Sequence, residues 1–70
     1  MTEPKPERLV RFKEVQDRTG LKRSTIYRLI SEGHFPKPLR PAYMRISVWP
    51  ESVLAAWIED QIARSRERQG

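Results

Sequence analysis

Residues 22–31 hold most of the side chains in this chain that could recognise another molecule. If residues 23–32 form a helix, Ile26, Leu29 and Ile30 make one apolar stripe, because they recur at helical spacing. The remaining positions then offer cationic, hydroxyl and aromatic groups, from Lys22, Arg23, Ser24, Thr25, Tyr27, Arg28 and Ser31. An arginine can donate two hydrogen bonds to guanine, and hydroxyl groups can donate to phosphates or bases. This set on a single helix, which the roughly 12 Å wide major groove admits, indicates DNA recognition. Arg23 and Arg28 are the strongest candidates for contact with a base or a phosphate.

Each of these side chains also has a structural interpretation that the sequence leaves open. Ser24 or Thr25 can cap the helix or hydrogen-bond within it. Tyr27 can flank the core instead of contacting a ligand. Arg28 can pair with Glu32 one turn later, an exposed ion pair that contributes roughly 0.3–0.5 kcal/mol.

A second basic surface is predicted from the alternation of Met44, Ile46 and Val48 with polar residues, which is typical of a half-buried strand. We expect a β-hairpin over residues 38–49, turning at residues 40–43 with Pro41 at the second turn position. Its tip and edge would carry Arg40, Tyr43 and Arg45, with Lys37 just before it. Such a wing can follow a phosphate backbone or enter the minor groove. The alternative is an ordinary basic edge, which discourages aggregation.

The elements around these two surfaces follow from apolar spacing and from glycine and proline. Residues 9–12 are expected to form a short strand, which could pair with the hairpin and leads into a helix that Gly20 ends. Gly33, with Pro36 and Pro38 beyond it, ends the helix over residues 23–32. The short turn at residues 20–22 has helix-turn-helix spacing, although an ordinary pair of antiparallel helices would look the same.

The C-terminal third is expected to close the core. A last helix begins with Pro50 at its first position, and its wide apolar stripe consists of Val53, Leu54, Trp57, Ile58 and Ile62. Trp49, Trp57 and Phe35 are interpreted as packing residues, since aromatic side chains bury a large area. We expect residues 1–8 to be a disordered arm, residues 9–63 to be the domain and residues 64–70 to be a charged tail that frays.

Composition excludes several classes of protein. The 70 residues contain 14 Lys and Arg against nine Asp and Glu, a net charge of +5, and no cysteine. Residues 18–45 carry seven basic residues and one acidic residue, whereas residues 50–70 carry three basic and four acidic ones. A basic stretch of this kind is typical of nucleic-acid binders. His34 has no second histidine, and no set of catalytic groups is apparent, so we expect no enzyme, metal, cofactor or small-molecule ligand. No apolar run suggests a membrane segment or signal peptide, so we expect an intracellular protein.

The run from Thr19 to Ile30, followed by Glu32 to Pro38, resembles the AlpA family of phage-associated regulators. The resemblance covers about residues 9–62 and continues through Arg45, Trp49, Ser52, Val53 and Trp57. It implies a winged helix-turn-helix related to MerR and excisionase domains, in a cytoplasmic bacterial protein associated with the nucleoid through DNA. It places DNA recognition at Arg23, Ser24, Thr25, Tyr27 and Arg28, and a wing contact at residues 40–45. Two positions depart from the family pattern: Lys22 replaces a capping serine, and the wing lacks the usual turn glycine.

The fold class that these features predict is α+β, a small winged helix-turn-helix with a hairpin wing and a C-terminal helix. The function expected is a sequence-specific regulator of mobile-element or prophage genes, such as an integrase gene. It would bind double-stranded DNA as a homodimer or cooperatively. Two alternatives stay open: an excisionase-like protein that bends DNA, and a protein-interaction module that uses the helix at residues 50–63.

Overall fold

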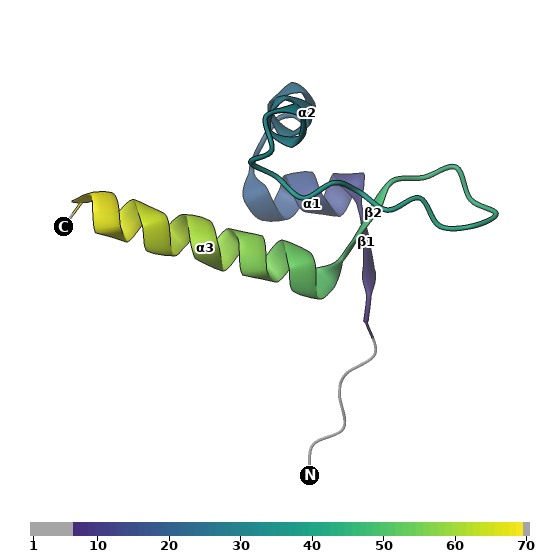
Figure 1. The fold of residues 1–70 in the computed structure, drawn as a ribbon. Coiled ribbons are helices and arrows are strands. Elements are labelled where there is room, and N and C mark those ends of the chain that lie inside the picture. The colour runs from purple at the N-terminus through teal and green to yellow at the C-terminus, as the bar shows by residue number, and fades with distance from the viewer. Residues whose placement is uncertain (1–6, 70) are drawn as a thin grey trace, which may run out of the picture.

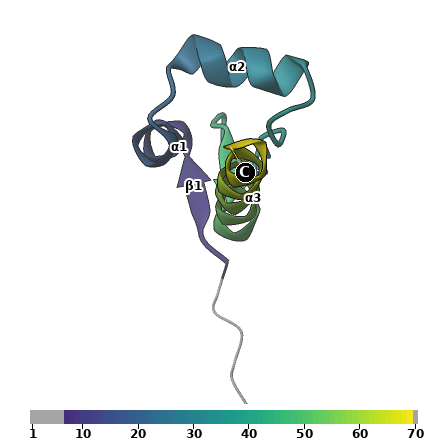
Figure 2. The same cartoon turned by 90° about the vertical axis from the view of Figure 1, so that its left-hand side faces the viewer.

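The computed structural model describes residues 7–69. Its elements are strand β1 (Leu9–Arg11), helices α1 (Phe12–Thr19) and α2 (Arg23–Ser31), strand β2 (Val48–Pro50) and helix α3 (Glu51–Gln69) (Figure 1). Helix α2 runs across the direction of α1 and α3, so that it is seen side-on where α3 is seen end-on (Figure 2). The predicted α+β class and small winged helix-turn-helix are confirmed.

The two strands pair antiparallel, with Val10 opposite Trp49 and Arg11 opposite Val48. Val10 and Trp49 are fully buried, so this central pair turns its side chains into the core. The pairing confirms that residues 9–11 serve as a partner strand. It also brings the start of α1 beside the residues that precede β2.

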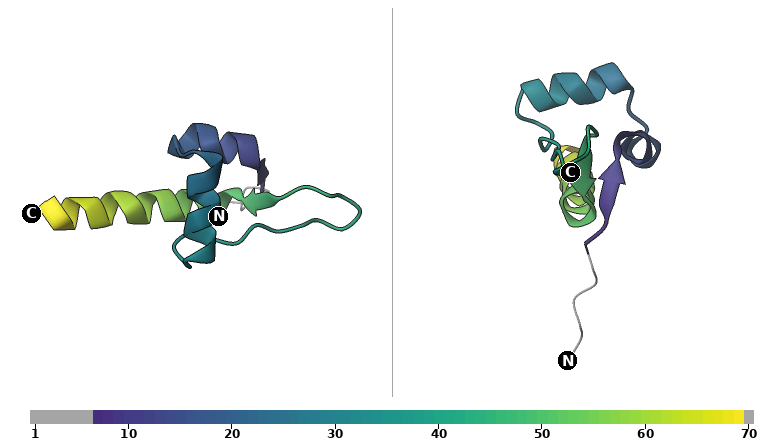
Figure 3. Two further views of the ribbon diagram at one scale, coloured as in Figure 1. Left: turned by 90° about the horizontal axis from the view of Figure 1, so that it is seen from above. Right: turned by 90° about the vertical axis from the view of Figure 1, so that its right-hand side faces the viewer.

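The β-hairpin predicted for residues 38–49 is reduced to a single bridge between Leu39 and Val48, where two backbone hydrogen bonds of 2.7 and 3.0 Å join the chain. Between them the chain forms a loop that projects away from the body, at the opposite end from the C-terminus of α3 (Figure 3). We call residues 39–48 the wing. The predicted strand from Met44 onward is wrong, because the loop leaves the body: Met44 is about half exposed, and β2 begins only at Val48.

The turn of the wing also lies one residue later than predicted. The Met44 amide donates to the Pro41 carbonyl at 3.2 Å, so Pro41 is the first turn residue and not the second. Tyr43 therefore occupies the third position, where its φ is +69°. A positive φ at this position is what a type II turn requires, and glycine normally supplies it.

Both predicted glycine stops are confirmed. Gly20 adopts the left-handed conformation after α1, and its amide donates to the Gln16 carbonyl. After α2, Gly33 has φ +79°, and the amides of Gly33 and His34 donate to Ile30 and Leu29 at 3.1 and 2.8 Å. This pair of bonds is the Schellman motif, which satisfies the last carbonyls of a helix. The chain can therefore leave α2 sharply toward the wing.

The core joins every element around the indole of Trp49. Its buried members are Val10, Val15, Ile26, Phe35, Trp49 and Leu54, and Trp57 packs against them half-buried. Trp49 Nε1 donates to the Pro36 carbonyl at 2.8 Å, and Trp57 Nε1 donates to the His34 carbonyl at 2.7 Å. The interpretation of Trp49, Trp57 and Phe35 as packing residues is confirmed. The two indoles hold the α2–wing connection against the body, which fixes where the wing starts.

Helix α3 starts at Glu51, so Pro50 lies just before the helix and not at its first position. The helix continues through Gln69, past the segment from residue 64 that the sequence predicted to fray. Leu54 is fully buried, whereas Val53 and Ile62 of the predicted stripe are exposed. None of the helices within residues 7–69 combines the length and apolar character needed to cross a bilayer.

Glu7 and Arg8 hold the start of α3, while residues 1–6 of the expected arm lie outside the described residues. The Glu7 carboxylate accepts hydrogen bonds from the Ser52 amide and hydroxyl at 2.9 and 2.8 Å, and the Arg8 carbonyl accepts one from the Glu51 amide at 2.8 Å. Arg8 also pairs with the carboxylates of Glu14 and Glu51. These contacts tie the segment before β1 to α1 and α3.

The Glu7 carboxylate caps the first turn of α3 through Ser52, and we expect this cap to stabilise the fold in a pH-dependent way. Hydrogen bonds from Ser52 lower the pKa of the Glu7 carboxyl below its ordinary value. Because the folded-state pKa is the lower one, the stabilisation is complete above the ordinary glutamate pKa and is lost as pH falls through the lowered value. We expect the melting temperatures of wild type and Glu7→Gln to differ at pH 7, and the difference to shrink as the pH falls below the ordinary glutamate pKa. A constant difference across this range would contradict the cap.

Candidate nucleic-acid interface

The DNA-contacting side chains predicted from the sequence lie mostly on the exposed side of α2. Ile26 faces the core, and the predicted recognition residues lie on the other sides of the helix. The exposed ones are Lys22, Arg23, Ser24, Tyr27, Arg28 and Ser31, whereas Thr25 is half-buried. Guanidinium, hydroxyl and phenol groups thus share one convex surface about as wide as a helix. This is the shape and chemistry that the major groove of DNA accepts.

Arg28 and Ser31 make polar contacts at the C-terminal end of α2. Arg28 pairs with Glu32 at 3.2 Å, and the Ser31 hydroxyl donates to the Arg28 carbonyl at 2.8 Å. Both members of the ion pair are well exposed, so it contributes well under 1 kcal/mol. A stronger anionic or hydrogen-bonding partner can therefore take Arg28 from Glu32 at little cost.

Tyr27 neither enters the core nor stands free, but stacks on Phe12 at the start of α1. The ring centroids are 5.3 Å apart with an interplanar angle of 22°. The Arg23 guanidinium lies over both rings, 4.8 Å from the Phe12 centroid and 5.4 Å from that of Tyr27. Cation–π contacts of this kind are worth about 0.5–1 kcal/mol at exposed sites. Arg23 is therefore held on the side of α2 that faces α1.

A basic cleft of about 540 Å³ opens beside this stack. Its cationic residues come from β1, from α1, from α2 and from the end of the wing; they are Arg11, Lys13, Arg23 and Arg45. Phe12, Tyr27, Ile46 and Ser47 complete the lining, which contains no acidic residue. Sequence reasoning missed Arg11 and Lys13, because they lie before the basic segment of residues 18–45. Their only signal is that they flank the aromatic Phe12.

The start of α2 has the missing cap that the sequence indicated. Lys22 occupies the capping position in extended conformation, and no side chain caps the helix there. The Thr19 hydroxyl donates to the Val15 carbonyl and accepts the Leu21 amide, so it orders the turn before α2 instead. The first amides of α2 therefore remain available to an external acceptor.

The wing separates its predicted residues. Arg40 and Tyr43 are exposed at the projecting loop, whereas Arg45 lies nearer the body and lines the basic cleft. Lys37 is exposed on the connection between α2 and the wing. The structure thus brings Arg45 together with Arg23, but leaves Tyr43 fully exposed and outside the cleft lining.

The strained backbone of Tyr43 predicts opposite effects on stability and binding. A non-glycine residue in the left-handed conformation costs roughly 1–2 kcal/mol, and asparagine tolerates it better than tyrosine does. We expect Tyr43→Asn to keep or raise the melting temperature while weakening DNA binding several-fold. Tyr43→Phe, which retains the ring, is the matched control and should bind like wild type. Unchanged DNA affinity in Tyr43→Asn would mean that the wing tip does not touch DNA.

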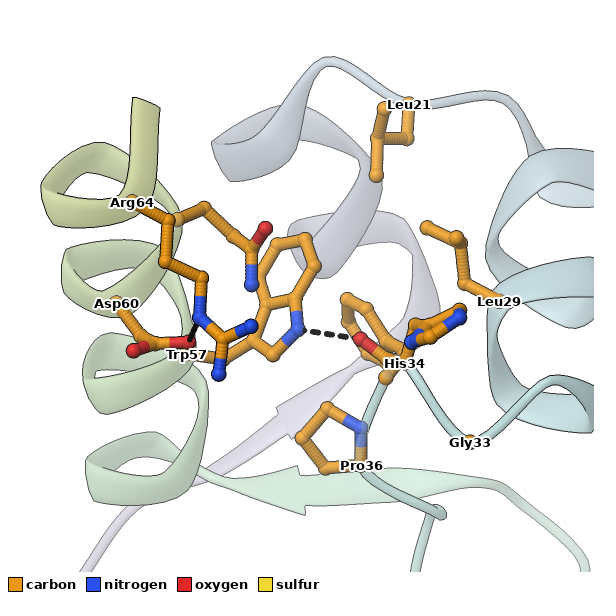
Figure 4. Close-up of a pocket in the computed structure, with 10 residues that line it drawn as sticks. Leu21, Leu29, Gly33, His34, Pro36, Trp57, Asp60 and Arg64 are labelled. Carbon is orange, nitrogen blue, oxygen red and sulfur yellow. Dashed lines mark hydrogen bonds and ion pairs between the residues drawn. The ribbon is translucent and has the colours of Figure 1, made fainter. Parts of the chain in front are cut away.

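A larger hollow, of about 670 Å³, lies between α3 and the chain that follows α2 (Figure 4). Leu21, Leu29 and Trp57 form its apolar part, and Asp60 and Arg64 stand at its rim. The indole N–H is already bonded to His34, and the two rim charges pair with each other at 2.8 Å. This hollow therefore offers packing surface more than free polar groups.

Comparisons with known proteins agree with this arrangement. The model of the family described as "Prophage CP4-57 regulatory protein (AlpA)" matches residues 8–62, which include both helices of the helix-turn-helix, the wing and the first part of α3. The chain belongs to the AlpA family. AlpA proteins are phage-associated DNA-binding regulators, and the family is not one of enzymes.

A phage protein is also similar to this AlpA chain. "Uncharacterized protein ORF88" of Enterobacteria phage P4 is 40% identical over 57 residues, which are 81% of this chain and 64% of that protein. The chain therefore spans a little under two thirds of this relative's length. No solved structure matches the chain with statistical significance.

Proposed function

We propose that this AlpA protein is a sequence-specific transcriptional regulator of prophage or other mobile-element genes, such as an integrase gene. Helix α2 enters the major groove of double-stranded DNA, and the wing contacts the adjacent backbone or minor groove. The observation that carries this proposal is the exposed face of α2, with Arg23, Tyr27 and Arg28 beside a basic wing. Acting on bacterial DNA, the protein would be found with the nucleoid.

Selection of bound sequences from a random DNA pool tests this proposal. We expect a defined motif to be enriched, and its affinity to fall as salt rises. Contacts to four or five phosphates would give a log–log slope of roughly −4. No enrichment together with a flat salt response would contradict a DNA regulator and favour a protein-interaction module.

Self-association is proposed through α3. The apolar side chain of Ile62 stays exposed on this helix, and the exposed C-terminal half of α3 runs from acidic Glu59 and Asp60 to basic Arg64 and Arg66. Two such helices packed antiparallel would place the acidic part of one against the basic part of the other. We expect a homodimer in sedimentation, or cooperative binding on DNA. Monomers at high micromolar concentration with no cooperativity would contradict this part alone.

DNA bending is the second candidate function, and the wing tip favours it. Tyr43 and Met44 are exposed side by side at the end of the projecting loop. Apolar side chains inserted between base steps from the minor groove unstack and kink the duplex. A circular-permutation gel shift separates the two functions: a large bend supports an excisionase-like role, and a straight complex supports simple regulation.

A further inference from the structure

We infer that the basic cleft binds a phosphate of the DNA backbone and that Arg23 belongs to this phosphate site, leaving base reading on α2 to Arg28. The inference rests on the proposed function, and it assigns the cleft residues Arg11 and Lys13 a part in binding. Its ligand class is a phosphodiester. The four cations of the cleft are Arg11, Lys13, Arg23 and Arg45.

The four cations of the cleft differ from other arginines of the chain in their ion pairing. Arg8, Arg18, Arg28 and Arg64 each pair with a carboxylate, but within residues 7–69 no carboxylate pairs with any of the four cleft cations. Four like charges that line one hollow repel one another, and an anion placed among them relieves the repulsion. Phosphate is the anion that a DNA-binding surface meets first.

Arg23 is held beside α1 by the aromatic rings of Phe12 and Tyr27. Its guanidinium is held over the Phe12 and Tyr27 rings, and Nη2 lies 3.5 Å from the Tyr27 hydroxyl oxygen. These contacts direct it toward α1 and into the cleft, beside Arg11 and Lys13. Among the described residues, Arg28 has no such contact with α1, and its ion pair is with Glu32, just after the end of α2. The two arginines of α2 are thus set for different tasks.

The register of β1 and β2 brings the end of the wing to the cleft. Because Arg11 lies opposite Val48, the end of the wing with Arg45 and Ser47 passes close to the start of α1. The cleft therefore contains residues from both surfaces proposed to touch DNA, α2 and the wing. A phosphate bound here would fix the register of the protein on the duplex without reading its sequence.

Neutral variants of the cleft test the inference on a selected DNA site and on random DNA. We expect Arg11→Gln, Lys13→Gln and Arg23→Gln each to reduce the salt slope by at most about 0.9, because the cleft holds a single phosphate. Each should weaken binding to both DNAs by the same factor. Arg68→Gln, at the far end of α3, is the matched control and should leave slope and affinity unchanged. Circular dichroism would verify that each variant folds. Unchanged slopes in Arg11→Gln and Lys13→Gln, or altered sequence preference in Arg23→Gln, would overturn the inference.

The Phe12 ring lies under the Arg23 guanidinium, so we expect Phe12 to position Arg23 in the cleft. A double-mutant cycle tests this role. If its ring orients Arg23, Arg23→Gln should weaken binding less in a Phe12→Leu background than in wild type. Phe12→Tyr keeps the ring and should restore the full effect. Additive losses would mean that Phe12 acts only in packing. If wild type bound no DNA, the proposed function itself would fail, whereas normal binding with unaffected cleft variants would defeat only the phosphate site.

Discussion

Trp49→Ala is expected to leave most of the protein unfolded at room temperature. Trp49 is fully buried, contacts the rings of Phe12 and Phe35, and bonds the Pro36 carbonyl. Truncating a buried tryptophan to alanine typically costs about 3–5 kcal/mol. A single core in a domain of this size rarely supplies more than about 3–5 kcal/mol. The substitution therefore removes most of the available stability.

Chemical denaturation followed by circular dichroism measures this effect. Trp49→Phe retains a ring but loses the indole hydrogen bond, so its unfolding free energy should lie between those of wild type and Trp49→Ala. Asp17→Ala, on the exposed side of α1, is the surface control and should change stability by less than about 0.5 kcal/mol. A cooperative transition in Trp49→Ala within about 1 kcal/mol of wild type would show that the core does not depend on this residue.

Arg28→Ala is expected to weaken binding to the selected DNA site by about 1–3 kcal/mol, as for an arginine that reads a base. The loss should concentrate at one or two base pairs, where the variant no longer prefers guanine. The Glu32 pair does not prevent this role, because both side chains are well exposed and the pair is weak. Fluorescence anisotropy with the selected site and single-base variants of it would measure the effect.

Arg28→Lys is the matched control for that result. It keeps the positive charge but lacks the planar fork that donates two bonds to guanine. We expect wild-type affinity for random DNA and lost discrimination at the guanine. If Arg28→Ala instead weakened all sequences equally, Arg28 would be a phosphate contact and the division of tasks on α2 would be wrong.

The local features of the fold could be predicted from the sequence because each depends on a few neighbouring residues. Gly20 and Gly33 end α1 and α2 because each adopts a positive φ, which glycine tolerates. The apolar positions around Ile26 define the buried side of α2. The alternation at Met44, Ile46 and Val48 misled, because a strand needs a surface to cover. The wing extends beyond the body (Figure 1), and of these three residues only Val48 lies in a strand that pairs with another strand.

The candidate site was predictable only where one helix supplies it. Arg23, Tyr27 and Arg28 share α2, so helical spacing alone places them together on its surface. Arg11 and Lys13 meet Arg45 of the wing through the pairing of β1 with β2, a contact between residues almost forty positions apart. The stack of Tyr27 on Phe12 is likewise a contact between two helices. Spacing along the chain carries no signal for such contacts.

Methylation interference on the selected DNA site tests the placement of α2 most directly. Methylation of guanine N7 alters the major groove, and methylation of adenine N3 alters the minor groove. We expect N7 methylation at one or two guanines to block binding of wild type, and Arg28→Ala to become insensitive at one of them. Binding that tolerates every N7 methylation and is blocked only from the minor groove would contradict the entry of α2 into the major groove.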